Sequence, residues 1–167
     1  MVKKKLLDIT VIGDRGTFDQ VNFLAGLFRV GEKEVTSVKH LADRLGSLCA
    51  GGDRIAALQI IDHGNQTGQY IGADWLALKT LPGLRADLVR LRPLFGKGAV
   101  VTMAGCKVGH APGLLSQLSI LWGGVQVRAG TAYQRPLIPG IEGGVTACDL
   151  NGCTYSGPTV FDRLDGR

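Results

Sequence analysis

The chain has 167 residues, of which 45% are hydrophobic and 20% are charged, a composition that indicates a folded globular protein and excludes a disordered one. The net charge is +5, but apart from Lys3-Lys4-Lys5 the basic residues are dispersed and form no stripe interleaved with aromatic residues, which argues against nucleic acid as a partner. No segment approaches the ~20 apolar residues that span a bilayer, and Asp8 interrupts the short apolar run after the basic start. We therefore expect neither a membrane partner nor a secretory signal.

These bounds predict one domain over residues 1–167, located in the cytoplasm and long enough to bury a hydrophobic core. A reducing compartment favours thiols over disulfides, so free thiols are expected, with the alternative that Cys148 and Cys153 form a cross-strand pair that oxidises in air. The four cysteines are Cys49, Cys106, Cys148 and Cys153. No cofactor is expected, and the oligomeric state is not predicted by the sequence.

The first elements in chain order are a strand and a helix. Residues 5–13 form a β-rich run, and a helix is predicted over 38–49. The apolar positions of this helix recur at intervals of three and four residues, with Thr36 or Ser37 as the N-cap and two glycines after it as the stop. The segment between the strand and the helix shows no clear periodicity.

Three nearly continuous apolar runs follow, separated by helical patterns. The runs cover 54–61, 99–105 and 125–131, the helices cover 84–95 and 113–124, and a turn is predicted at 96–98. Continuous apolar runs are typical of strands buried on both faces of a parallel sheet. Their alternation with helices implies parallel β-α-β units. The predicted fold is therefore α/β, a three-layer α/β/α sandwich with a mostly parallel sheet.

The end of the chain has a different pattern. Residues 145–148 and 153–156 flank an Asn151-Gly152 pair, which is the typical turn of a two-stranded hairpin. We expect a C-terminal β-hairpin in addition to the parallel units.

Two reactive side chains directly follow predicted strands, His63 after 54–61 and Cys106 after 99–105. The carboxyl ends of parallel strands meet at one edge of a sheet, where ligands bind, so we expect the imidazole and the thiol to face one cleft. The imidazole can then take the thiol proton, and the thiolate is the nucleophile. The sequence thus predicts a Cys–His dyad.

Glycines flank both candidates. Gly64 lets the backbone turn after His63 and exposes an N–H group. Together with the N–H of Cys106, it forms the predicted oxyanion hole for a tetrahedral intermediate. Gly105 lets a substrate carbonyl approach the Cys106 sulfur.

The sequences around these residues resemble clan CD cysteine peptidases, which include caspases, legumain, separase, gingipains and the bacterial CHAT-type domains. Residues 61–69, IIDHGNQTG, resemble the His-Gly motif of the clan, with an Asp-His-Gly order like that of legumain. Residues 100–109, VVTMAGCKVG, resemble the second motif, an apolar strand that ends at the catalytic Cys. The next helix and strand resemble those of bacterial caspase-like domains, so the likeness covers roughly residues 54–131.

The resemblance implies a caspase-haemoglobinase fold and a cysteine endopeptidase that acts on a protein or peptide substrate. His63 would be the general base or acid, Cys106 the nucleophile, and Gly64 and Cys106 the oxyanion donors. Asp14 and Arg15 follow the first strand, a region that in this family helps to shape the pocket for the side chain before the scissile bond. Asp14 would favour a basic substrate residue and Arg15 an acidic one, although both can equally be solvated loop charges.

The glycine- and proline-rich segment 130–144 is a second candidate for contact with substrate, or else an irregular connection. Its candidate side chains are Tyr133, Gln134, Arg135 and Glu142. No motif of the resembled family matches the chain beyond residue 131.

Three alternatives remain open. The first is a catalytically silent caspase-like module that binds a protein partner. The others are a zinc-stabilised domain and a nucleic-acid-binding domain. The zinc hypothesis rests on a Cys3His set in which the first pair lacks the usual C-x2-C spacing. That set consists of Cys106, His110, Cys148 and Cys153.

Overall fold

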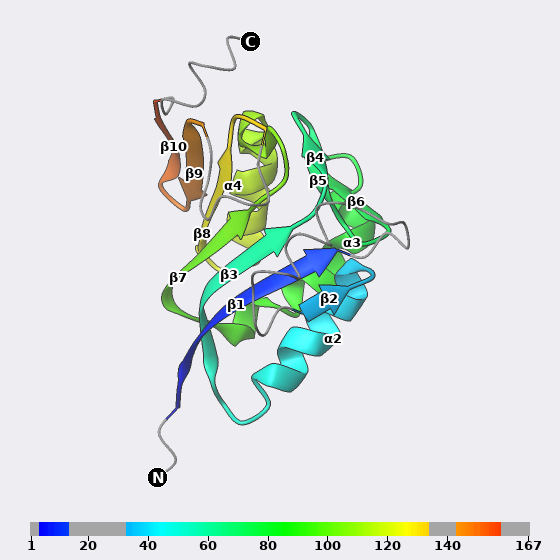
Figure 1. The fold of residues 1–167 in the computed structure, drawn as a ribbon. Helices are drawn as coiled ribbons and strands as arrows, with labels where there is room; N and C mark the ends of the chain where they lie inside the picture. Colours follow the sequence, from blue (N-terminus) through cyan, green and yellow to red (C-terminus); the bar gives the residue numbers. More distant parts are fainter. Residues whose placement is uncertain (1–3, 14–32, 134–142, 158–167) are drawn as a thin grey trace.

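The computed structural model describes residues 4–13, 33–133 and 143–157, and its centre is a seven-stranded sheet with the order β10-β9-β8-β7-β3-β1-β2 (Figure 1). The strands are β1 Leu6–Gly13, β2 Lys33–Val35, β3 Arg54–Ile61, β7 Phe95–Met103, β8 Gln126–Gly130, β9 Val145–Asp149 and β10 Gly152–Ser156. The pairs from β2 to β8 are parallel, and β9 and β10 add antiparallel to that edge. The predicted α/β class, the mostly parallel sheet and the C-terminal hairpin are confirmed.

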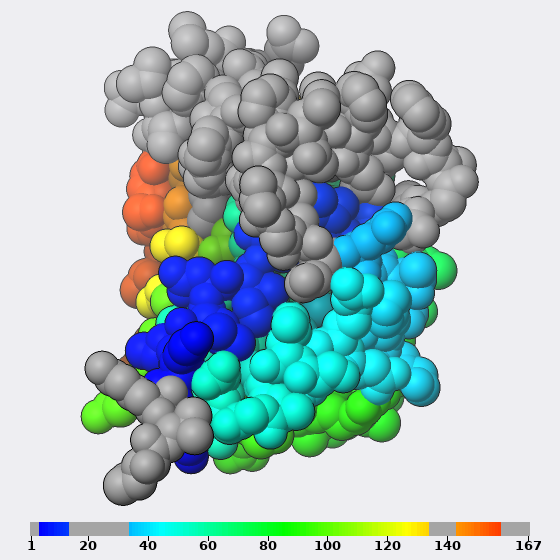
Figure 2. Space-filling view, turned by 60° about the horizontal axis from the view of Figure 1, so that its bottom comes forward, coloured from blue at the N-terminus to red at the C-terminus, as the bar shows by residue number. Residues whose placement is uncertain are grey.

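Three helices, α2 Val38–Leu48, α3 Leu81–Val89 and α4 Pro112–Leu121, form one layer, because α3 contacts both α2 and α4. Their apolar sides close the main hydrophobic core on one face of the sheet. The sheet side of this core includes the register neighbours Val11, Ile60, Met103 and Ala129. The space-filling view shows α2 (cyan) beside β1 (blue), with the β9–β10 hairpin (orange) on the other side of β1 (Figure 2).

The opposite face of the sheet carries a polar row. Thr10, Gln59, Thr102 and Arg128 are successive register neighbours, and Arg128 Nε donates a hydrogen bond to Thr102 Oγ1 at 3.0 Å. Thr102 of this row is buried and Arg128 is exposed, so the prediction of burial on both faces holds at Thr102 and was wrong at Arg128. Since the helices of the described residues cover one face, the third layer of the sandwich stays a prediction.

The helix predicted over 84–95 begins and ends earlier than expected. Helix α3 starts at Leu81 and stops at Val89, and a 3-10 turn at Arg92–Leu94 follows, with Pro93 inside it. The predicted turn at 96–98 lies within β7, because Phe95 already pairs with Ile55 of β3. Pairing with a neighbouring strand has overridden the local helical periodicity.

Helix α2 begins where the sequence predicts, and its start also anchors a turn that was not predicted. Ser37 Oγ accepts from the N–H of His40 at 3.0 Å, and Asp74 Oδ2 accepts from the N–H of Val38 at 2.8 Å. Gly72 has a φ of +59° and lies so close to Thr36 that a side chain would collide with the Thr36 backbone. The loop that follows β3 is thereby held on the helix layer.

The polar stretch after β3 folds into a small antiparallel sheet that was not predicted from the sequence. Its strands are β4 Gly64–Asn65, β5 Gly68–Ile71 and β6 Asp74–Ala77, in the order β4-β5-β6. Figure 1 shows this sheet beyond the arrowhead of β3. None of the helices in the described part of the chain has the length and apolar character needed to cross a bilayer.

Candidate active site

His63 and Cys106 lie beyond the carboxyl ends of two adjacent parallel strands. β3 ends at Ile61 and β7 at Met103, and the two strands pair in parallel. The strand order reverses between β1 and β3, because the chain leaves β1 toward β2 on one side and leaves β3 toward β7 and β8 on the other, so the switch point borders the end of β3 that carries His63 and lies one strand away from β7. Such a switch point is where open α/β sheets bind ligands. His63 is exposed and Cys106 is partly exposed, so solvent reaches both.

The two segments are brought together by direct contact between glycines. A side chain placed on Gly64 would lie 3.1 Å from the Cα of Gly105 and 2.6 Å from Cγ2 of Val108. The residue after His63 thus packs against the residue before Cys106, with no room for a side chain between them. This backbone proximity agrees with the expectation of one shared cleft, and the dyad itself stays a prediction.

A buried glutamine completes this contact. Gln69 of β5 has no exposed surface, its Nε2 donates to the carbonyl of Ile60 at 2.9 Å, and its Oε1 accepts from the N–H of Gly105 at 2.8 Å. We call Gly64, Gln69 and Gly105 the strand-end junction. The junction ties the end of β3, the small sheet and the segment before Cys106 into one unit.

Asp62 anchors the segment of His63 from the other side. Its carboxylate is buried, and it accepts from the N–H of His63 at 2.7 Å and from the N–H of Gly72 at 2.9 Å. It also lies against Gly13 at the end of β1, where a side chain would overlap Asp62 Oδ2. No role was predicted for Asp62 from the sequence, although its place next to His63 in the Asp-His-Gly order was a signal.

The hydrogen-bond pattern of the small sheet bears on the predicted oxyanion hole. The N–H of Tyr70 donates to the carbonyl of His63 at 2.8 Å, and Gly64 pairs with Gln69 one step along. In an antiparallel pair, hydrogen-bonded and non-hydrogen-bonded positions alternate. The N–H of Gly64 therefore points away from β5, as an oxyanion donor must.

The segment after Cys106 is tied to the end of β8. Lys107 has a left-handed backbone with a φ of 58°, and its N–H donates to the carbonyl of Ala132 at 2.9 Å. The Lys107 ammonium lies 4.1 Å from the ring centroid of Tyr133, within cation–π range. Tyr133 of the predicted segment 130–144 is thus next to the site. The predicted residues Asp14, Arg15, Gln134, Arg135 and Glu142 lie outside the described residues.

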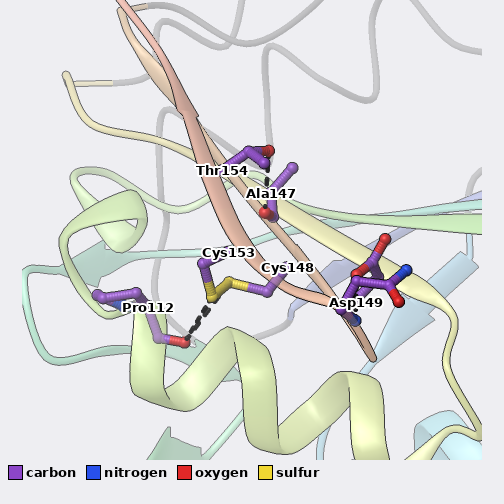
Figure 3. Close-up of a disulfide and its surroundings, with 7 residues drawn as sticks. Pro112, Ala147, Cys148, Asp149, Cys153 and Thr154 are labelled. Carbon is purple, nitrogen blue, oxygen red and sulfur yellow. Dashed lines mark hydrogen bonds between the residues drawn. A yellow bond between two sulfur atoms is a disulfide. The ribbon is translucent and has the colours of Figure 1, made fainter.

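The cysteines correct two expectations. Cys148 and Cys153 are directly opposite in β9 and β10 and form a disulfide, so the expectation of free thiols was wrong for this pair and the alternative of an oxidised cross-strand pair agrees with the structure (Figure 3). The zinc hypothesis fails with it, because disulfide sulfurs are not thiolate ligands, and no cluster suited to a metal occurs among the described residues. Cys49 and Cys106 carry thiols, and burial raises the pKa of Cys49.

A hollow of about 450 Å³ lies between the β4–β5 turn and the start of α4, and neither His63 nor Cys106 is among the residues that line it. Gln66 and Thr67 line one side, shortly after His63 in the chain, and His110 and Pro112 line the other, shortly after Cys106.

A comparison of the chain with known protein families, curated proteins and solved structures finds no match. The resemblance to clan CD therefore rests on the two motifs around these residues.

Proposed function

We propose that the protein is a cysteine endopeptidase of the caspase-like type, which cleaves a protein or peptide substrate by acyl transfer through Cys106. The observation that carries the proposal is the junction of two adjacent strand ends, where Gly64 packs on Gly105 and so brings the backbones of His63 and Cys106 together. A nucleophile and its base need this proximity, and ordinary core packing does not require a thiol and an imidazole at such an edge.

The proposed mechanism begins when His63 takes the thiol proton of Cys106. The thiolate attacks the scissile carbonyl carbon, and the N–H groups of Gly64 and Cys106 stabilise the oxyanion. The carbon–nitrogen bond breaks as the protonated imidazole gives its proton to the leaving amine. Water, deprotonated by His63, then hydrolyses the thioester and restores the thiol.

The fold that goes with this proposal is the caspase-haemoglobinase sandwich. A mostly parallel sheet with one helix layer on it supports that fold, and the second helix layer belongs to the proposal. Substrate selection by Asp14 or Arg15 is part of it as well. The proposed location is the cytoplasm, and the hairpin disulfide is the observation that speaks against it, since disulfides are rare in a reducing compartment.

The test is cleavage of a peptide library by the wild type, Cys106→Ala, His63→Ala and the double variant. Both single variants should lose turnover, and the losses should not add, because a nucleophile and its base act as one unit. Cys49→Ala is the matched control, since it removes a thiol from the helix layer, and it should retain activity.

Full activity in Cys106→Ala would remove the cysteine-protease proposal. No cleavage by the wild type, together with binding of a protein partner that neither substitution affects, would favour the catalytically silent module instead.

A further inference from the structure

Gln69 is unusual among the polar side chains of the described residues, because it is fully buried and both ends of its amide are bonded to backbone. Nε2 donates to the carbonyl of Ile60 in β3, and Oε1 accepts from the N–H of Gly105 after β7. The two partners belong to different strands, so the amide spans the gap between them. A buried amide with both ends satisfied is rigid, since any movement breaks a bond that water cannot replace.

The amide extends the β3–β7 ladder beyond the point where the strands separate. The carbonyl of Ile60 accepts from the N–H of Ala104 at 2.8 Å and also from Gln69 Nε2. The next N–H along the chain, that of Gly105, donates to Gln69 Oε1. β3 has by then turned into Asp62 and His63. The Gln69 side chain therefore takes over the function of β3 in holding the β7 segment, one residue before Cys106.

We propose that Gln69 is a positioning residue, which holds Cys106 at the distance from His63 that proton transfer requires. The inference rests on the proposed function, in which His63 activates the Cys106 thiol. Gln69 belongs to β5, which pairs with β4 directly after His63, and it bonds directly before Cys106. It is thus linked to both segments by single backbone steps.

The chemistry of an amide fits this role better than that of other side chains of similar length. One end must donate to a carbonyl and the other must accept from an N–H, and neither end carries a charge that burial would penalise. Methionine has the length but makes neither bond. Glutamate accepts from Gly105, and it donates to Ile60 only in its neutral form, which burial favours.

The test is the rate of Cys106 alkylation by iodoacetamide as a function of pH, followed by mass spectrometry of the peptide that carries Cys106. This readout reports thiolate formation and needs no known substrate. The proteins are the wild type, His63→Ala, Gln69→Met, Gln69→Glu and the double variant His63→Ala/Gln69→Met. Trp122→Phe is the matched control, because it removes a buried side-chain bond to a backbone carbonyl, that of Leu88, in the helix layer.

We expect Gln69→Met to move the inflection of the pH profile upward by about one unit and to slow alkylation near neutral pH about tenfold, because the thiolate loses its imidazole partner. Gln69→Glu should lie nearer to the wild type, and Trp122→Phe should leave the inflection in place. In the His63→Ala background, Gln69→Met should add no further shift. Should Gln69→Met fail to fold, Gln69→Asn, which is too short to span both partners, replaces it with the same expected shift.

The positioning role would be overturned by an unchanged inflection of the pH profile in Gln69→Met, or by a shift of that inflection that is equal with and without His63. Gln69 would then be a residue that only stabilises the packing. A shift in Gln69→Glu as large as that in Gln69→Met would also overturn the positioning role. A wild-type inflection that His63→Ala does not move would instead overturn the proposed function, so the two failures are distinguishable.

Discussion

Substitution of Gly105 by alanine probes the junction with the smallest change available. A Cβ at this position would lie 2.7 Å from Gln69 Oε1 and 3.0 Å from Gln69 Cγ and Cδ. Cβ atoms in proteins essentially never approach other heavy atoms more closely than 3.0 Å. We therefore predict that Gly105→Ala destabilises the protein, although alanine is a small and apolar residue.

The magnitude follows from the two ways in which the structure can relieve the collision. Gln69 cannot swing out, because it is fully buried and bonded to Ile60. If its amide tilts away, the buried N–H of Gly105 loses its partner, which costs about 1–3 kcal/mol. If Gly105 shifts instead, it meets Gly64, and overpacking of this kind costs about 1–3 kcal/mol. Either route lowers the free energy of unfolding by about 2 kcal/mol.

The assay is urea unfolding followed by the fluorescence of the two tryptophans, Trp75 and Trp122, with Gly83→Ala as the control. Gly83 lies in α3, and a Cβ added there would meet nothing within 4 Å, so alanine should stabilise the helix by up to about 1 kcal/mol. If Gly105→Ala unfolds at the same urea concentration as Gly83→Ala, the steric argument for the junction is wrong.

Three further predictions concern thiols and charges. Iodoacetamide should label Cys106 before Cys49 in the native protein, because Cys49 is buried and its pKa is raised; the reverse order in a mass-spectrometric time course would contradict the nucleophile assignment. Replacing both cysteines of the β9–β10 disulfide by alanine should lower the free energy of unfolding by about 2 kcal/mol, and reduction of the wild type should produce a similar loss in the same urea assay. Hydrogen bonds from Lys39 and Arg90 lower the pKa of Asp43 in the folded protein. These bonds therefore stabilise the fold at a pH above the pKa that Asp43 has in the unfolded chain, and the stabilisation is lost as the pH falls through the pKa of Asp43 in the folded protein. The difference in stability between the wild type and Arg90→Gln should accordingly narrow as the pH falls below 3.8, and a constant difference would show that the pair contributes nothing.

The parts of the fold that could be predicted well from the sequence are those with a strong local signal. Helix α2 has apolar residues at helical spacing and a serine cap, and β3 has eight residues that form a nearly continuous apolar run. The residues that follow a predicted strand in the sequence must lie beyond its carboxyl end. The placement of His63 beyond β3 and of Cys106 beyond β7 could therefore be deduced. In these cases local chemistry and tertiary packing favour the same structure.

The parts that were missed depend on partners far away in the chain. Strands β4 to β6 have two to four residues each, too short for any periodicity to show. The helical pattern of 84–95 continues past Val89, but a 3-10 turn that contains Pro93 follows the helix, and Phe95 already pairs with Ile55 of β3. Gln69 gave no signal, because nothing near it in sequence indicates that its amide meets Ile60 and Gly105, nine and 36 residues away.

The glycines beside the candidate dyad illustrate how a correct position can carry an incomplete reason. From the sequence, Gly64 was explained by a sharp turn and an exposed N–H, and Gly105 by access for a substrate carbonyl. The structure adds a constraint that both share, since Gly64 packs on Gly105 and neither has room for a Cβ. A side chain on either residue would disturb the same two strand ends, and Gln69, buried and bonded across the gap, would have to move with them. The requirement for glycine at both positions is therefore already present in the free protein, before any substrate binds.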